Sequence, residues 1–476
     1  MHHPRIARFR DATALRAHLA SIAAPLPLDD APLAAAESPL ARPLVLGGRT
    51  AGNRWCIHPM EGWDATPEGR PSEMLLRRWR RFGASGAKLI WGGEAVAVVP
   101  EGRANPRQLT APACAAEGFA TLLSAVRDTH RERFGDDDLV VALQLTHSGR
   151  FSHPDPAGRR PRIACRNPWT DGRVGIVDDA AVVRDEELPP LVDAYVRAAR
   201  DAAAAGFDMV DVKACHGYLV HEFLSARRRA GPYGGDLAGR SRLLREIVTA
   251  VRAACPRLLV GVRLSLFDTP PWQRSGDAAA PVAVEGTYDC GFGVDPSDPS
   301  RGDLAEPIAV IRMLRDLGVA AVNATAGSPY TTPHLLRPAA FPPSDGYPPP
   351  EDPLRGVWRQ VDAVRQVKAA VPEMPLVGSA YTYLQEYLPH AAQAIVRLGW
   401  VDAVGLGRMV LSYPELPADV LAGRPLVRNR ICRTFSDCTT APRNGLPSGC
   451  YPLDEAYTQR EPEATRLAEA KAAARR

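Results

Sequence analysis

The chain has 476 residues, of which 45% are hydrophobic and 24% are charged, and its formal net charge is +4 at pH 7. This length allows two or three domains, or one large barrel with insertions, and the composition excludes general disorder. The small net charge lacks the concentrated basic face of a nucleic-acid-binding protein. Only four of the 58 cationic residues are lysines, namely Lys88, Lys213, Lys368 and Lys471. Each lysine in this arginine-rich chain is therefore a candidate for a specific role.

Signals for a membrane or an oxidising compartment are weak. No uncharged apolar run of about 18 residues occurs, so a membrane span is not expected. The apolar stretch near the N-terminus is interrupted by Arg16 and His18, which makes it a poor signal peptide. Nine cysteines are thinly spread over a long chain, unlike a disulfide framework. We therefore expect a cytoplasmic protein.

Short apolar runs alternate with amphipathic segments after an Ala/Pro-rich N-terminal extension, residues 1–45. Near-continuous apolar strands separated by helices indicate a parallel sheet, and eight such units indicate a closed (β/α)8 TIM barrel over residues 46–425. The predicted strands are 55–59, 88–92, 139–145, 209–214, 258–265, 320–325, 375–380 and 402–407. The predicted helices lie near 72–84, 114–134, 188–205, 240–254, 304–317, 355–370 and 384–399.

Three of the connections from a strand to the following helix are long. They cover residues 150–185, 266–302 and 327–353, and all are rich in Pro, Gly and Asp. In a barrel such loops lie at the C-terminal face, where active sites form. We expect residues 327–353, which carry Tyr330, His334 and Phe341, to act as a lid.

The alternating pattern ends at about residue 425. Residues 426–476 form a cysteine-bearing segment with no periodicity, followed from residue 453 by an Ala/Glu/Arg-rich tail that we expect to be a solvated helix.

The fourth predicted strand carries the most informative cluster. Lys213, His216 and Tyr218 lie at or just beyond its C-terminal end. A His followed two residues later by a Tyr can anchor a carbonyl oxygen and donate a proton beside it. Alone, the same residues would be interpreted as a structural turn with satisfied polar groups.

This segment resembles the Old Yellow Enzyme family of FMN-dependent oxidoreductases, and in particular the barrel of the dienoyl-CoA reductase and trimethylamine dehydrogenase branch. Its sequence continues with Phe223-Leu224-Ser225, Tyr233-Gly234-Gly235 and Arg240 at the family's spacing. The resemblance extends from about residue 43 to 425. The other matching motifs are Asn53-Arg54 with Pro59-Met60, Gly92-Gly93-Glu94, Gln144 to Arg150, Gly261 to Ser265, Gly378-Ser379 and Gly405 to Arg408.

The resemblance implies flavin contacts at these motifs. Gln144 would contact the pyrimidine of FMN, and Arg263 would face the N1 and O2 side, where a cation favours the reduced flavin. Glycine turns after strands seven and eight suit a phosphate, with Arg408 as a planar charged fork. The implied cofactor-binding residues are Pro59, Met60, Gln144, Arg263, Gly378, Ser379, Gly407 and Arg408.

Lys213 departs from the family pattern, which usually has a His at this position. One hypothesis is that Lys213 donates to a carbonyl or carboxylate oxygen of the substrate. The other is that it pairs structurally with Glu94 or Asp211.

Cys432, Cys438 and Cys450 resemble the iron–sulfur segment of the same branch, but Phe435 occupies the position of the second ligand. A four-iron cluster normally needs four thiolates, so a [4Fe-4S] cluster is doubtful. The alternatives are a zinc site, no ligand at all, or an evolutionary remnant.

The resemblance implies an ene-reductase-like enzyme in which FMN N5 takes a hydride from NAD(P)H and passes it to a carbonyl-conjugated C=C bond. Lys213 and His216 would polarise the carbonyl, and Tyr218 would supply the proton. Two alternatives stay open: amine oxidation or demethylation with electrons leaving to an acceptor, and a flavin-free scaffold. No GxGxxG motif, HExxH motif, Walker loop or GxSxG motif is present, so electrons would come from NAD(P)H or a redox partner protein. Barrels of this kind often associate, so a homo-oligomer is a further option.

Overall fold

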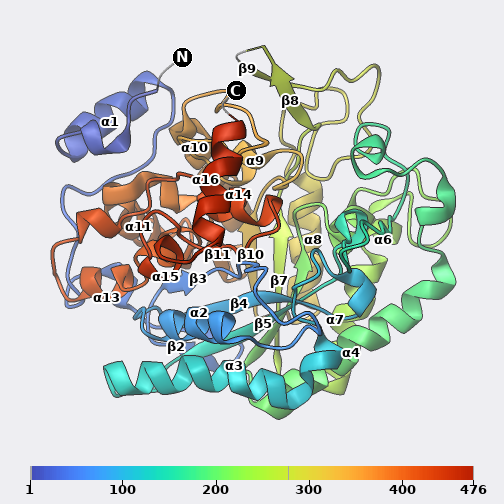
Figure 1. Cartoon of the computed structure of the whole chain (residues 1–476), viewed down its shortest axis with the longest axis horizontal. Helices are drawn as coiled ribbons and strands as arrows, with labels where there is room; N and C mark the ends of the chain where they lie inside the picture. Colours follow the sequence, from blue (N-terminus) through green and yellow to red (C-terminus); the bar gives the residue numbers. More distant parts are fainter. Residues whose placement is uncertain (1–2, 277, 475–476) are drawn as a thin grey trace.

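Eight parallel strands close into a barrel in the order β3-β4-β5-β6-β7-β10-β11-β12 (Figure 1). The computed structural model describes residues 3–276 and 278–474. It confirms the (β/α)8 barrel and all eight predicted strands, although several are shorter than expected. The strands are β3 (Trp55–Ile57), β4 (Leu89–Ala97), β5 (Val140–Thr146), β6 (Met209–Ala214), β7 (Leu259–Ser265), β10 (Ala321–Thr325), β11 (Leu376–Gly378) and β12 (Ala403–Leu406).

Amphipathic helices surround the barrel. In α2, for example, Ser72 caps the first turn by accepting from the backbone N–H of Leu75, and the apolar face of Leu75, Trp79 and Phe82 is fully buried. The helices are α1 (Ala12–Ser21), α2 (Glu73–Gly83), α3 (Ala111–Phe134), α4 (Leu188–Ala205), α5 (Leu219–Leu224), α6 (Leu237–Arg240), α7 (Arg242–Ala254), α8 (Ala305–Asp316), α9 (Pro333–Leu336), α10 (Pro353–Ala370), α11 (Leu388–Arg397), α12 (Met409–Ser412), α13 (Leu416–Leu421), α14 (Asp437–Arg443), α15 (Glu455–Thr458) and α16 (Glu463–Ala473).

An antiparallel hairpin covers the N-terminal end of the barrel. It consists of β1 (Leu44–Leu46) and β2 (Arg49–Ala51). Leu44 and Leu46 are buried in one cluster with interior side chains of the barrel, including Trp91 and Met209. The floor of the barrel is therefore apolar and closed, and polar side chains gather at the opposite end.

Both ends of the chain pack onto the barrel. In the N-terminal extension, Leu15 and Leu19 of α1 belong to the main hydrophobic core. The predicted tail helix is present as α16, whose residues are exposed or partly exposed except for Leu467, which is only 3% exposed and packs with Tyr451 and Tyr457. Burial of this apolar face holds α16 against the C-terminal segment. The domain boundaries at residues 45 and 425 stay a prediction.

The loop after β7 contains a second hairpin, β8 (Trp272–Ser275) with β9 (Ala278–Pro281), which projects beside the C-terminal helix in Figure 1. None of the helices in the described part of the chain is both long enough and apolar enough to cross a membrane.

Candidate active site

A cavity of about 610 Å³ opens at the C-terminal ends of the barrel strands. Its walls come from the ends of β3, β7, β10, β11 and β12, from the loops after β5, β6 and β10, and from the C-terminal segment. Its size lies in the usual range for cofactor and small-molecule sites. The residues discussed below that line it are His58, Pro59, Met60, Glu61, Phe151, Arg159, Arg173, His216, Tyr218, Arg263, Tyr330, Arg337, Ser379, Gly407, Arg408 and Arg443.

One side of this cavity suits a flavin mononucleotide. The Nε atom of Arg263 and the Nη1 atom of Arg408 are buried and have no hydrogen-bond partner among the described residues. A buried guanidinium N–H without a partner is costly, so both atoms indicate a missing anionic or carbonyl ligand. At Gly407 an added Cβ would have only Met60 within 4 Å, which leaves open space for the backbone to approach a ligand. The donor set therefore fits FMN, whose ring Arg263 would contact and whose phosphate Arg408 would hold.

Most of the predicted flavin residues lie at this cavity, but two do not. Pro59, Met60, Arg263, Ser379, Gly407 and Arg408 line it. Gln144 is buried, and its side-chain amide donates to Oδ2 of Asp211 at 2.5 Å. Gly378 lies where a Cβ would collide with the hydroxyl of Tyr381, so a glycine is needed there for packing. For these two residues a direct flavin contact stays a prediction.

A hydrogen-bonded network of four side chains forms the other side of the cavity. Oε1 of Glu61 accepts from Nζ of Lys213 at 3.0 Å and from the hydroxyl of Tyr218 at 2.9 Å. The hydroxyl of Tyr330 lies 3.2 Å from that of Tyr218, and the ammonium group of Lys213 lies 3.8 Å from the centre of the Tyr218 ring. The ring of Tyr330 stacks on Phe151 with centroids 3.8 Å apart. These contacts place Tyr218 at the centre of the network.

The Tyr218 phenol stays protonated across the neutral pH range. Burial, followed by the charge of Glu61, raises the pKa of Tyr218 well above its ordinary value near 10. The same two causes raise the pKa of Tyr330 to about 12. Both groups can therefore donate a proton, and neither acts as a base at neutral pH.

His216 follows β6 in a left-handed backbone conformation with φ of 64°. Its Nε2 atom lies 3.2 Å from the hydroxyl of Thr325 on β10. Burial, then the charges of Arg263 and Lys213, lower the pKa of His216 well below 6.5. The ring is therefore neutral and offers one N–H donor and one acceptor rather than a positive charge.

The expected structural partners of Lys213 were wrong. Its amino group pairs with Glu61, whereas Glu94 pairs with Arg78 at 2.7 Å and Asp211 accepts from Gln144. The side chains of Lys213 and Glu61 are 93% and 84% buried, so this ion pair consists of two opposite charges that are largely shielded from water. The proposed contact of Lys213 with substrate stays a prediction, because Glu61 lines the cavity and Lys213 does not.

The family match follows from the sequence itself. The model of the NADH:flavin oxidoreductase / NADH oxidase family matches residues 39–284. The chain belongs to this family. Membership confirms the resemblance to the Old Yellow Enzyme family of flavin oxidoreductases.

Two related proteins match this chain over only part of their own length. Rice 12-oxophytodienoate reductase 1 is 39% identical over 130 residues, which are 26% of this chain and 34% of the relative. NADPH dehydrogenase of Bacillus licheniformis is 31% identical over 219 residues, which are 45% of this chain and 59% of the relative. The matches therefore span less than two thirds of either relative.

Solved structures confirm the fold of this family. A 2-naphthoyl-CoA reductase in complex with 2-naphthoyl-CoA aligns with a TM-score of 0.66 at 18% identity, covering 89% of this chain and 58% of the other. The Old Yellow Enzyme homologue of Zymomonas mobilis aligns with a TM-score of 0.57 at 24% identity, covering 82% and 94%.

The cysteine segment does not fit a four-iron cluster. Cys432, Cys438 and Cys450 border a cavity of only about 20 Å³, which has room for about one water molecule. Phe435, at the expected second ligand position, is 38% exposed and stacks on Phe341. Burial raises the pKa of the free Cys432 thiol to about 11.

One other cluster in the described part of the chain has the ligand types of a metal site, namely His130, Asp136 and Asp138. The amino group of Lys88 occupies it, at 2.9 Å from Nε2 of His130 and 2.6 Å from Asp136, and also pairs with Asp138. A fixed cation therefore already balances these carboxylates, which gives Lys88 a structural role.

Several site residues were missed from sequence. Glu61 directly follows the Pro59-Met60 motif. A carboxylate next to a predicted flavin-binding motif is the sequence signal that could have identified it as a site residue. The loop after β5 supplies Phe151, Arg159 and Arg173 to the cavity, although no periodicity distinguishes them. Of the predicted lid residues, Tyr330 lines the cavity, His334 bonds the carbonyl of Tyr347, and Phe341 lies outside on Phe435.

Proposed function

We propose that this protein is an NAD(P)H-dependent ene-reductase that reduces a C=C bond conjugated with a carbonyl group. The observation that carries the proposal is a protonated, buried Tyr218 that faces the same cavity as the flavin-binding residues. When bound, FMN would supply hydride transfer between the nicotinamide and the substrate. The remaining chemistry is the placement of the carbonyl and the delivery of one proton.

In this proposal His216 binds the carbonyl oxygen. Its neutral imidazole offers an N–H donor at the mouth of the barrel, and Thr325 holds the ring in place. Lys213, which is the direct partner of Arg263 across the β6–β7 pair, holds Glu61 beside Tyr218 on the same side. A hydrogen bond to the carbonyl oxygen stabilises the negative charge that develops there.

Tyr218 donates the proton to the α-carbon. Its hydroxyl hydrogen can rotate between Glu61, Tyr330 and a substrate carbon. The nearby Tyr330 hydroxyl can return a proton to Tyr218 after transfer, because the two oxygens are 3.2 Å apart.

An anaerobic titration tests the function. The protein as isolated is expected to show flavin absorbance without cluster absorbance, NAD(P)H is expected to bleach it, and an enone such as 2-cyclohexenone is expected to restore it. A colourless protein that takes up no FMN, or a flavin bleached by amines and not by NAD(P)H, would contradict the proposal. The latter result would favour amine oxidation, which is disfavoured by the pairing of the cavity carboxylates Glu61 and Asp345 with Lys213 and Arg443.

Substitution of Glu61 tests the proton-donor network. Glu61→Gln removes the negative charge that, after burial, raises the pKa of Tyr218, so the phenol is expected to ionise at lower pH. The rate of enone reduction should then begin to fall at a lower pH than in the unaltered protein, because the proton-donating form is lost as pH rises. The measurement is the pH profile of the oxidative half-reaction.

Asp345→Asn is the matched control for this profile, because Asp345 also lines the cavity but pairs with Arg443. Its profile should keep the position of the unaltered protein. An unshifted profile for Glu61→Gln would show that Glu61 does not control Tyr218.

A further inference from the structure

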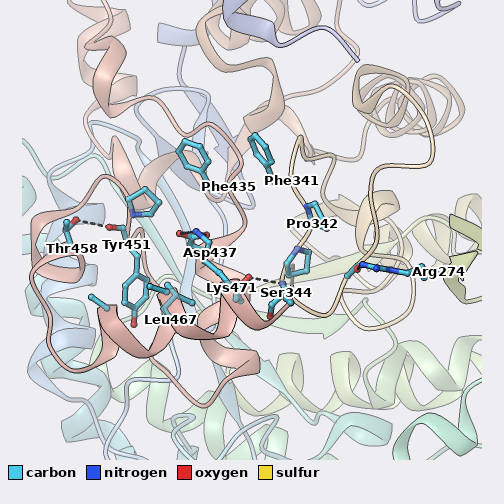
Figure 2. A pocket seen from close by; sticks show the side chains of 17 residues that line it. Arg274, Phe341, Pro342, Ser344, Phe435, Asp437, Tyr451, Thr458, Leu467 and Lys471 are labelled. Carbon is cyan, nitrogen blue, oxygen red and sulfur yellow. Dashed lines mark hydrogen bonds and ion pairs between the residues drawn. The ribbon is translucent and has the colours of Figure 1, made fainter. Parts of the chain in front are cut away.

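The loop after β10 is joined to the C-terminal segment by several contacts. The backbone N–H of Ala340 donates to the hydroxyl of Thr434 at 3.0 Å, and the hydroxyl of Ser436 donates to the carbonyl of Phe341 at 2.7 Å. The ring of Phe341 also stacks on that of Phe435, with centroids 5.8 Å apart (Figure 2). The loop and the C-terminal segment therefore form one hydrogen-bonded unit.

This loop brings a second arginine next to Arg408. Arg337 lines the active-site cavity together with Arg408 and Gly407. The Nη2 atom of Arg408 donates to the carbonyl of Pro338, the residue that follows Arg337, at 2.8 Å. The Nη1 atom of Arg337 in turn donates to the hydroxyl of Thr439 on α14. Two guanidinium groups from different loops thus border the same side of the cavity.

The charges of these two arginines are not balanced by the protein. In residues 3–276 and 278–474, Arg337 bonds a hydroxyl and Arg408 bonds a carbonyl, and no carboxylate pairs with either. Burial, then the charges of Arg408 and Arg443, lower the pKa of Arg337 below its ordinary value. An anion between the two guanidinium groups would relieve their repulsion, and a phosphate monoester carries close to two negative charges at neutral pH.

We propose that Arg337 and Arg408 together bind the phosphate of FMN, and that Thr439 holds Arg337 in place for this contact. Arg337 is then a cofactor-binding residue of the loop after β10, and Thr439 is a positioning residue of the C-terminal segment. The phosphate would connect the cofactor to a segment outside residues 46–425, so FMN binding and the docking of that segment would stabilise each other. The inference rests on FMN as the cofactor of the proposed function, but not on any step of the reaction.

Titration of the deflavinated protein with FMN and with riboflavin, which lacks the phosphate, tests the role of Arg337. Arg337→Gln is expected to weaken FMN binding about tenfold or more and to change riboflavin affinity by no more than about twofold, because only FMN loses a charge-assisted hydrogen bond. The retained riboflavin affinity also shows that the variant is folded.

Arg355→Gln is the matched control for Arg337→Gln. Arg355 lies in the helix that follows the same loop, pairs with Glu351 and is 53% exposed, so its loss should leave both flavin affinities unaltered. Equal losses of FMN and riboflavin affinity in Arg337→Gln, or no loss of FMN affinity, would overturn the inference while leaving the proposed reaction intact.

Two substitutions at Thr439 test the positioning role. Thr439→Val removes the hydroxyl that accepts from Arg337, so FMN affinity should fall by about threefold or more. Thr439→Ser keeps the hydroxyl and should retain the affinity of the unaltered protein. If the serine and valine variants bind FMN equally well, the hydroxyl does not position Arg337.

Hydrogen exchange of the full chain tests the connection to the C-terminal segment. At equal saturation, FMN should slow amide exchange in α14 more than riboflavin does, and Arg337→Gln should remove this difference. Equal protection of α14 by the two flavins in the unaltered protein would overturn the connection. Neither measurement involves turnover, so a failure of enone reduction would not affect these results.

Discussion

Replacement of Tyr218 by Phe is expected to slow enone reduction by on the order of 10²–10⁴-fold, the usual contribution of a positioned general acid. Reduction of the flavin by NAD(P)H should proceed almost normally, because that step needs no proton from Tyr218. The expectation follows from the position of the phenol, which is protonated, buried and part of the cavity wall. Stopped-flow measurement of the two half-reactions separates the effects.

Tyr387→Phe provides the control for this experiment. It also removes a single hydroxyl, one that donates to the carbonyl of Phe9 at 2.8 Å outside the cavity. Both half-reactions should remain near the rates of the unaltered protein. If Tyr218→Phe reoxidises with enone at the unaltered rate, the proton comes from another group, and Tyr330 is the nearest alternative donor.

Replacement of Arg408 by Gln is expected to weaken FMN binding by about 10- to 100-fold and riboflavin binding much less. The Nη1 atom of Arg408 is buried without a partner among the described residues, while Nη2 is held by the carbonyl of Pro338 at 2.8 Å. The held guanidinium is therefore aimed at a charged ligand, and a hydrogen bond to a charged group contributes about 1.5–3 kcal/mol. Fluorescence titration of the deflavinated protein with each flavin measures the difference.

Arg424→Gln is the comparison for Arg408→Gln, since Arg424 pairs with Asp419 and is 55% exposed. It should leave both flavin affinities unaltered. An equal loss of FMN and riboflavin affinity in Arg408→Gln would mean that Arg408 supports the loop at Pro338 rather than the phosphate.

The barrel was predictable because its strands are buried on both faces. Continuous apolar runs such as Val140–Thr146 distinguish such strands from amphipathic helices without any long-range information. The tail helix α16 was also predictable, but the burial of its Leu467 among alanines and charged residues was not. One apolar residue does not produce a periodic signal, yet it is enough to hold a short helix against Tyr451 and Tyr457.

Site residues that directly follow a barrel strand could be predicted from the sequence. Site residues that reach the cavity through contacts between distant loops could not. His216 and Tyr218 come directly after β6, so the barrel geometry places them at the mouth. Glu61 pairs with Lys213 across 152 residues of sequence, and only the closure of the barrel brings β3 near β6. The position of Arg173 depends on the long loop after β5, whose path no periodic pattern in the sequence predicts.

The hairpin Leu44–Ala51 has a kinetic consequence. Because it closes the floor of the barrel with apolar side chains, ligands reach the described cavity from the C-terminal ends of the strands. In the proposed reaction, the nicotinamide and the compound to be reduced would then bind at the same face in turn, and each would exclude the other while it is bound. The two would alternate in a ping-pong sequence, and a high concentration of either would slow the arrival of the other.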